Sequence, residues 1–190
     1  MIIKIAGIIL AAGASNRFGS DKLQQKLGNG SYLGVVSAKK LQPFVDELKI
    51  VVPRNNEKRQ KIFCDFNNLI ISKKLPQFSD SLKMGLSAVQ NYDYCIIGLA
   101  DMPFISTATY ESLLSTLSLK RFDLIAPSFD GQRGHPVAIS SDVINHFLDS
   151  KEKVLIKDYF KKNEFKQLIF STQDAGILHD VDYPEDLSLK

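Results

Sequence analysis

The chain of 190 residues is long enough to bury a substantial core, and its 44% hydrophobic and 24% charged residues are typical of an ordinary globular protein. Its formal net charge of +3 and its scattered lysines argue against a nucleic-acid partner but suit a small anionic ligand. The apolar start has no signal-peptide pattern, no apolar run is long enough to span a bilayer, and Cys64 and Cys95 form no zinc motif, so we expect a cytoplasmic protein with reduced thiols and no membrane contact.

Apolar runs and helical patterns alternate along the first two thirds of the chain. Strands are predicted in the apolar run that begins at Ile5 and at residues 47–52, 69–71 and 94–99, and helices at residues 32–41, 57–66, 81–89 and 107–119. This alternation predicts an α/β fold, a three-layer α/β/α arrangement with a mostly parallel, Rossmann-like sheet, and residues 1–190 as a single domain. Functional residues are expected at the carboxyl ends of the strands, where such sheets bind their ligands.

The first strand leads into a glycine-rich turn that carries two cations. Backbone N–H groups in such a turn can approach phosphate oxygens closely. The spacing of Gly13, Gly19 and Lys22 matches neither a Walker loop nor the dinucleotide fingerprint. Arg17 offers a rigid fork of donors and Lys22 a mobile point charge, a pair suited to a triphosphate whose charge must be neutralised during reaction. The alternative is that both are solvated loop charges.

A single carboxylate ends the strand predicted at residues 94–99. Pro103 cannot continue a strand ladder, so Asp101 is expected at the carboxyl edge of the sheet, beside the glycine-rich turn. A carboxylate beside a triphosphate is repelled unless a divalent cation bridges them, and Mg²⁺ usually binds through one or two carboxylates plus phosphate oxygens. The alternative is that Asp101 caps the helix predicted at residues 107–119.

Two later segments carry polar residues for which the sequence allows more than one role. The acidic run at residues 179–187 predicts, on local grounds, a turn in which Asp182 caps a helix that begins at Pro184. The run at residues 130–139 begins with a turn and resumes as a strand, so it displays His135 at a loop-to-strand junction. A lone histidine in such a place is either structural or a pocket residue.

Four ordered motifs resemble those of the MobA-like nucleotidyltransferases, and together they cover the chain from Ile8 to Leu187. They are Leu10-Ala11-Ala12-Gly13-x-Ser15-x-Arg17-x-Gly19-x-x-Lys22, Leu99-Ala100-Asp101-Met102-Pro103, Gly131-x-x-Gly134-His135-Pro136-Val137 and Asp180-x-Asp182-Tyr183-Pro184-Glu185-Asp186-Leu187. The Ala-Ala-Gly form of the first motif resembles that of the molybdenum cofactor cytidylyltransferase branch, whereas the guanylyltransferase branch more usually has two glycines there.

The resemblance implies a sheet of the nucleotide-diphospho-sugar transferase type and a Mg²⁺-dependent transfer of CMP from CTP to the terminal phosphate of a molybdopterin-type cofactor, with release of pyrophosphate. It also implies a transient contact with a recipient molybdoenzyme, and we expect the protein to be a monomer. The implied catalytic residues are Arg17, Lys22 and Asp101, and the implied metal ligands are Asp101 and Asp182, with Asp180 as the alternative to Asp182. The implied nucleotide-binding residues are Leu10, Ala11, Ala12, Gly13, Ser15, Arg17, Lys22, Ser79 and Ser81. The implied substrate-side residues are Arg133, Gly134, His135 and Pro136, of which Arg133 would add a phosphate contact.

The chain departs from the family pattern ahead of Leu82. Where the cytidylyltransferases have Gly-Met-Ser-x-Ser-Leu, this chain has Gln77-Phe78-Ser79-Asp80-Ser81-Leu82, which places a negative charge near the expected base contact. Lys26 also stands where a proline is common. The alternatives left open are a molybdenum cofactor guanylyltransferase, a sugar- or alcohol-phosphate nucleotidyltransferase, and a non-catalytic nucleotide- or cofactor-binding module.

Overall fold

The strands form one mixed, mostly parallel sheet in a computed structural model that describes residues 3–15, 17–66, 69–72, 77–119, 122–150, 159–160 and 162–188. They are β1 Ile5–Leu10, β2 Glu47–Pro53, β3 Leu69–Ser72, β4 Tyr94–Leu99, β5 Leu124–Phe129, β6 Gln132–Arg133, β7 Val137–Ser140 and β8 Gln167–Ser171. The order is β3-β2-β1-β4-β7-β5-β6, and β8 pairs with β5. β1 runs parallel to β2 and β4, and β5 parallel to β8, whereas β7 runs antiparallel to β4 and β5.

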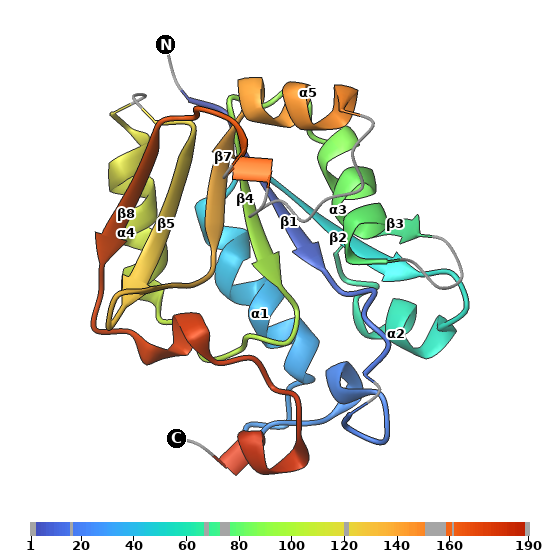
Figure 1. Ribbon diagram of the computed structural model, residues 1–190. Helices are drawn as coiled ribbons and strands as arrows, with labels where there is room; N and C mark the ends of the chain where they lie inside the picture. The colour runs from blue at the N-terminus through green and yellow to red at the C-terminus, as the bar shows by residue number, and fades with distance from the viewer. Residues whose placement is uncertain are drawn as a thin grey trace.

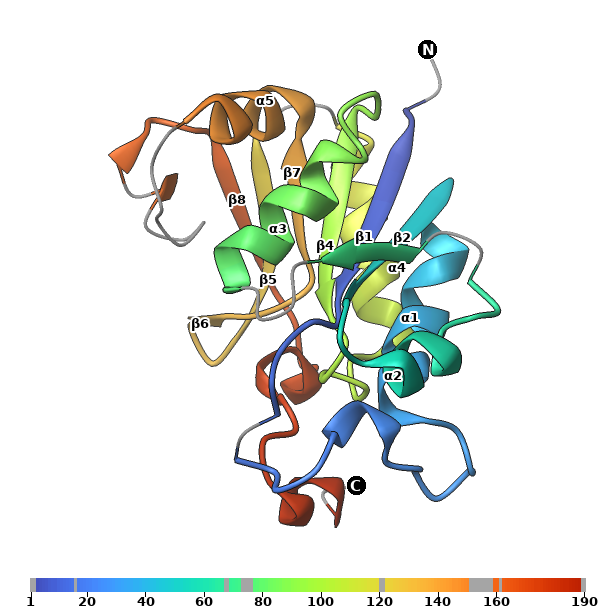
Figure 2. The same cartoon turned by 90° about the vertical axis from the view of Figure 1, so that its right-hand side faces the viewer.

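Helices cover both faces of this sheet (Figure 1 and Figure 2). They are α1 Leu33–Leu41, α2 Glu57–Ile62, α3 Phe78–Ser87, α4 Thr107–Leu117 and α5 Ser141–Asp149, with short 3₁₀ helices η1 Lys22–Gln24, η2 Gln42–Phe44, η3 Ala175–Leu178 and η4 Pro184–Ser188. Side chains of α1 and α4 belong to one core cluster, and those of α3 and α5 to another. The predicted three-layer arrangement is therefore confirmed. No helix in the described ranges is both long and apolar enough to cross a membrane.

The two core clusters follow from the alternation of side chains along the central strands. Ile9 of β1 belongs to the cluster of α1 and α4, whereas Ile8 of the same strand belongs to the cluster of α3 and α5. Because both faces are covered, these strands appear in the sequence as continuous apolar runs. On the α3 side the packing is close, since a Cβ atom on Gly85 would lie only 3.1 Å from Ile8 Cδ1.

The structure corrects several predicted elements. The helix predicted at residues 81–89 begins at Phe78, because the Asp80 carboxylate accepts a hydrogen bond from the Gln77 amide at 3.3 Å and so stabilises the first turn. The helix predicted at residues 57–66 ends at Ile62. Strands β5 and β8 and helix α5 were not predicted. The two strands belong to the second half of the sheet, and α5 packs on one of its faces.

Candidate active site

The glycine-rich turn and Asp101 leave the sheet at the same edge. β1 and β4 are neighbours with Leu10 paired to Leu99, and the Ala100 amide donates to the Leu10 carbonyl at 3.2 Å. The predicted placement of Asp101 beside the turn is therefore confirmed. Its alternative role as a helix cap is wrong, because the Ser106 side chain caps α4.

Lys22 lies between two carboxylates. Its Nζ atom is 2.9 Å from Asp101 Oδ2 and 2.9 Å from Asp182 Oδ1. Arg17 Nη1 contacts the other carboxylate oxygen of Asp182. The Lys22 side chain is 11% exposed and that of Arg17 is 67% exposed. Lys22, which the sequence suggested as the mobile charge, is thus the more firmly held of the two cations, and Arg17 lies at the open side of the site.

Asp182 reaches this site because the C-terminal segment pairs with the loop after β4. The amide of the buried residue Val181 donates to the Asp101 carbonyl at 2.9 Å. The backbone amide of Asp182 donates to Asp186 Oδ2 at 2.8 Å, which leaves the Asp182 carboxylate to face the two cations rather than to cap η4. Its predicted role as a helix cap is therefore wrong. The alternative carboxylate, Asp180, is exposed.

The charges of this group stabilise one another. Burial acts to lower the pKa of the Lys22 ammonium, but the adjacent carboxylates of Asp101 and Asp182 outweigh burial, and the pKa is raised above 10.5. The hydrogen bond from Lys22 holds the pKa of the Asp182 carboxyl below 3.8. The pairing therefore stabilises the fold between these two ordinary values. That stabilisation is lost as the pH falls through the lowered pKa of Asp182 or rises through the raised pKa of Lys22.

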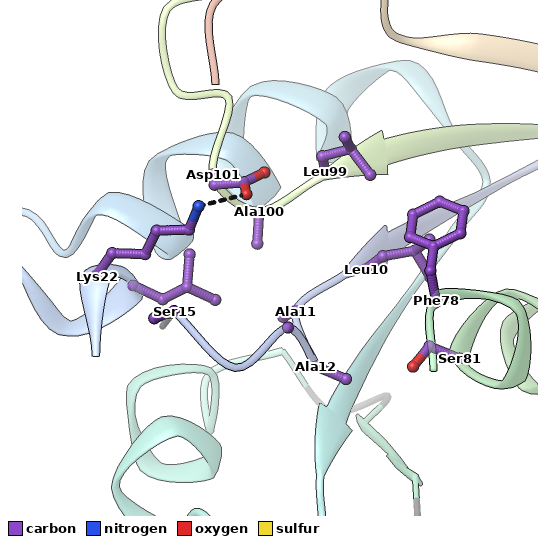
Figure 3. Close-up of a pocket in the computed structure, with 12 residues that line it drawn as sticks. Leu10, Ala11, Ala12, Ser15, Lys22, Phe78, Ser81, Leu99, Ala100 and Asp101 are labelled. Carbon is purple, nitrogen blue, oxygen red and sulfur yellow. Dashed lines mark ion pairs between the residues drawn. The ribbon is translucent and has the colours of Figure 1, made fainter. Parts of the chain in front are cut away.

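A cavity of about 190 Å³ opens between the glycine-rich turn and α3 (Figure 3). The Lys22–Asp101 ion pair lies at one end of it, and Phe78 and Ser81 of α3 lie at the other. Its lining residues are Leu10, Ala11, Ala12, Gly13, Ser15, Lys22, Leu23, Phe78, Ser81, Leu99, Ala100 and Asp101. An adjoining cavity of about 250 Å³ is lined by Gly13, Ala14, Ser15, Arg17, Lys22, Asp101 and Asp182. The predicted nucleotide-binding residues therefore lie together, except for Ser79, which lines neither cavity.

The two carboxylates fit a divalent cation such as Mg²⁺. Asp101 Oδ2 and Asp182 Oδ1 converge on one point, where the Lys22 ammonium now lies. In the part of the chain that the structure describes, no group of three or more His, Cys, Asp or Glu side chains is placed to hold a metal. Two carboxylates completed by water and substrate phosphate oxygens are the usual donor set for Mg²⁺.

Comparison with known sequences identifies the family. Residues 7–166 match the MobA-like NTP transferase domain, which is most of the chain. The chain belongs to this family. The match includes three of the four motifs, the one at residues 180–187 lying beyond it, and the family prediction is confirmed.

Relatives of this MobA-like NTP transferase domain carry more than one name. A probable molybdenum cofactor guanylyltransferase from Natranaerobius thermophilus is 31% identical over 135 residues, which are 69% of this chain and 63% of that protein. A 2-C-methyl-D-erythritol 4-phosphate cytidylyltransferase from Dictyoglomus thermophilum is 32% identical over 124 residues, which are 58% of this chain and 51% of that protein. The matches thus span less than two thirds of either relative. Rv0371c from Mycobacterium tuberculosis H37Rv shares the fold, with a TM-score of 0.81 at 17% identity over 99% of this chain and 97% of that one.

Three residues at the site of this MobA-like NTP transferase domain were missed by the sequence analysis. Phe78 is 43% exposed and lines the first cavity, at a position where the family pattern pointed to methionine. Asp21 and Arg59 form a buried ion pair behind the glycine-rich turn, with Arg59 Nη2 and Asp21 Oδ1 2.6 Å apart. Burial acts to raise the pKa of the Asp21 carboxyl, but hydrogen bonding and the charge of Arg59 outweigh it and lower that pKa. The sequence signal that could have pointed to this pair is the acidic residue Asp21 directly before Lys22.

The predicted substrate-side residues lie apart from the two cavities. Arg133 is exposed on β6, whereas Gly134 and Pro136 are buried. A Cβ atom on Gly134 would overlap the Ile177 carbonyl, which accepts a hydrogen bond from the His135 amide at 2.9 Å. Burial lowers the pKa of His135, and its Nδ1 atom has no partner among the described residues. None of the four lines either cavity, and their role toward a substrate stays a prediction.

Proposed function

We propose that this chain transfers CMP from CTP to the terminal phosphate of a molybdopterin-type cofactor and releases pyrophosphate. The observation that carries the proposal is the convergence of the glycine-rich turn, Lys22 and the carboxylates of Asp101 and Asp182 at one end of a cavity. A site that only bound a nucleotide would need no pair of carboxylates beside the phosphates, since they repel phosphate unless a cation lies between them. This counts against the non-catalytic module.

The cavity offers separate surfaces to the two ends of a nucleotide. Lys22, Arg17 and the amides of the turn supply positive charge and N–H donors for the triphosphate. The exposed ring of Phe78 supplies a stacking surface for the base, and the buried Ser81 hydroxyl lies beside it in the lining. Phe78 therefore takes the place that we had expected Ser79 to share with Ser81.

Asp101 and Asp182 would hold Mg²⁺, which when bound neutralises phosphate charge and orients the α-phosphate. A phosphate oxygen of the acceptor forms the new bond to the α-phosphorus, while the bond from the α-phosphorus to its bridging oxygen breaks. Pyrophosphate leaves with that electron pair. The acceptor phosphate is already an anion, so no general base is needed, and the contribution of Lys22 and Arg17 is positioning and charge neutralisation.

The choice of CTP rests on the Ala11-Ala12-Gly13 form of the first motif, which resembles that of the cytidylyltransferase branch. The methyl group of Ala12 and the Ser81 side chain both line the cavity, and a glycine at residue 12 would leave more room there. A narrower cavity favours a pyrimidine over a purine. The second candidate is transfer of GMP from GTP, favoured by the name of the Natranaerobius relative.

We expect pyrophosphate release only when CTP, Mg²⁺ and the molybdenum cofactor are all present, in an assay that tests CTP, GTP, ATP and UTP separately. The Ala12→Gly variant should raise the ratio of GTP to CTP use, measured as kcat/KM, by about tenfold, because one methyl group of pocket shape is worth about that much. If the natural protein released pyrophosphate with GTP and not with CTP, the nucleotide substrate would be GTP and the proposal of CTP would be wrong. Silence with all four nucleotides would contradict the proposed transfer.

We further propose that residues 1–190 act as one domain, in keeping with the single sheet, and that the protein works as a cytoplasmic monomer that passes its product to a recipient molybdoenzyme. Cys64 and Cys95 are both free thiols, as a reducing compartment requires.

A further inference from the structure

Arg59, on α2, donates hydrogen bonds to both ends of the glycine-rich turn. Its side chain is 3% exposed, and Nη1 donates to the carbonyls of Ala11 at 2.9 Å and Gly13 at 2.7 Å. Nε and Nη2 donate to the two carboxylate oxygens of Asp21 at 3.0 and 2.6 Å. Nη2 also approaches Ser15 Oγ at 3.4 Å. One guanidinium thus binds the start, the middle and the end of the turn.

These bonds fix the direction in which the amides of the turn point. A trans peptide is planar, so each carbonyl and the N–H of the next residue point in opposite directions. Because the carbonyls of Ala11 and Gly13 face Arg59, the N–H groups of Ala12 and Ala14 face away from it. Neither N–H donates a hydrogen bond to another described residue, and both residues line the cavities of the site. The turn therefore presents two free donors on the side opposite Arg59, as an anion-binding backbone does.

Hydrogen bonds to Asp21 also fix the backbone next to Lys22. The Asp21 carboxylate also accepts hydrogen bonds from Gln24 Nε2 at 2.6 Å and Asn56 Nδ2 at 2.6 Å, and it accepts the Leu23 amide at 3.2 Å as the cap of η1. Lys22 is the next residue, and its ammonium reaches the carboxylates of the site. The backbone that carries Lys22 is thus tied to α2 through Asp21.

We propose that Arg59 is a positioning residue that holds residues 11–15 and 17–22 as a triphosphate-binding surface, with the amides of Ala12 and Ala14 and the ammonium of Lys22 aimed at the phosphates. This inference rests on the proposed function, because it takes a nucleoside triphosphate as the ligand. A guanidinium is required, since its planar fork donates in several fixed directions at once, whereas a lysine ammonium at the end of a flexible chain does not.

The test compares the affinity for CTP with the affinity for cytidine, which has the same base and no phosphate. Calorimetry on Arg59→Lys should show CTP binding weakened by about tenfold to a hundredfold, with cytidine binding within about twofold of the natural protein, because a misplaced binding group of this kind costs about that much. The double variant Asp21→Asn with Arg59→Gln removes both charges and leaves no buried charge unpaired. If the lysine variant does not fold, the affinities for CTP and cytidine are measured on this double variant instead. Lys58→Gln, on the exposed face of the same helix, should bind both ligands normally.

The outcomes distinguish a failure of the role proposed for Arg59 from a failure of the proposed function. If folded Arg59 variants bind CTP as tightly as the natural protein does, or lose cytidine and CTP affinity equally, Arg59 is only a structural residue and the inference is overturned. If the natural protein itself binds none of the four nucleoside triphosphates, the proposed function fails, and the inference fails with it.

Discussion

Asp101→Asn is expected to reduce turnover by about a thousandfold while leaving the fold in place. An amide keeps the shape of the side chain but cannot neutralise a bound cation. The charge stabilisation lost is several kcal/mol, and each 1.36 kcal/mol corresponds to a factor of ten in rate. The Asp101 side chain is 26% exposed and lies in a loop at the edge of the sheet, so the thermal midpoint should change little. Steady-state pyrophosphate release and a melting curve on the same preparation measure both effects.

Variants of Asp182 and Asp180 test which of the two carboxylates joins Asp101 in binding the cation. Asp182→Asn should cause a loss of similar size. Asp180→Asn should lose far less, because the Asp182 carboxylate contacts Lys22 beside Asp101, whereas Asp180 is exposed. Glu111→Gln, on an exposed face of α4, serves as the control for the loss of a surface carboxylate. Full activity of Asp101→Asn at the normal Mg²⁺ concentration would show that Asp101 is not a ligand of the cation.

Lys22→Met is expected to lower kcat by about a hundredfold, the usual cost of removing one donor that faces developing charge. Methionine has a similar length and keeps the apolar contacts of the buried stem, so the fold should survive. Steady-state pyrophosphate release measures the loss in kcat. Without a cation, the carboxylates of Asp101 and Asp182 raise the pKa of Lys22, so the metal-free protein should keep this ion pair as the pH rises from 7 to the ordinary lysine value of 10.5. Melting curves of the metal-free protein across that pH range test this second expectation.

The control for Lys22 is Lys39→Met, which removes an exposed lysine from α1. That change should leave kcat unaltered. If Lys22→Met instead raised KM for the nucleotide without changing kcat, Lys22 would contribute equally to the ground state and the transition state, and its assignment to the chemical step would be wrong.

The parts of the site that the sequence predicted are those carried by local patterns. A glycine-rich turn after an apolar run, and a carboxylate followed by a proline after another, both indicate the carboxyl edge of a parallel sheet, and Asp101 lies there. Asp182 is different, because its local pattern indicated a helix cap. Only the pairing of Val181 with the Asp101 backbone, between residues far apart in the chain, turns it toward Lys22.

Arg59 shows why the remainder of the site was not predictable from spacing. It lies in a helix of six residues between other charged residues, where a solvated surface is the ordinary expectation. Its burial depends on how α2 packs behind the turn, which no local pattern reports. Similarly, Pro127 lies within β5, and a proline argues against a strand inside a sheet. That strand is therefore recognisable only once its neighbours are in place.

The most direct test of the account is whether a nucleotide and the two carboxylates hold the same cation. Electron paramagnetic resonance of Mn²⁺, used as a spectroscopic substitute for Mg²⁺, can follow the cation in the presence of a non-hydrolysable CTP analogue. We expect one tightly bound Mn²⁺ that requires the analogue and is lost in the double variant Asp101→Asn with Asp182→Asn. Binding of Mn²⁺ and the analogue to that double variant with unchanged affinity would show that the carboxylates serve only as partners of Lys22, and would contradict the account.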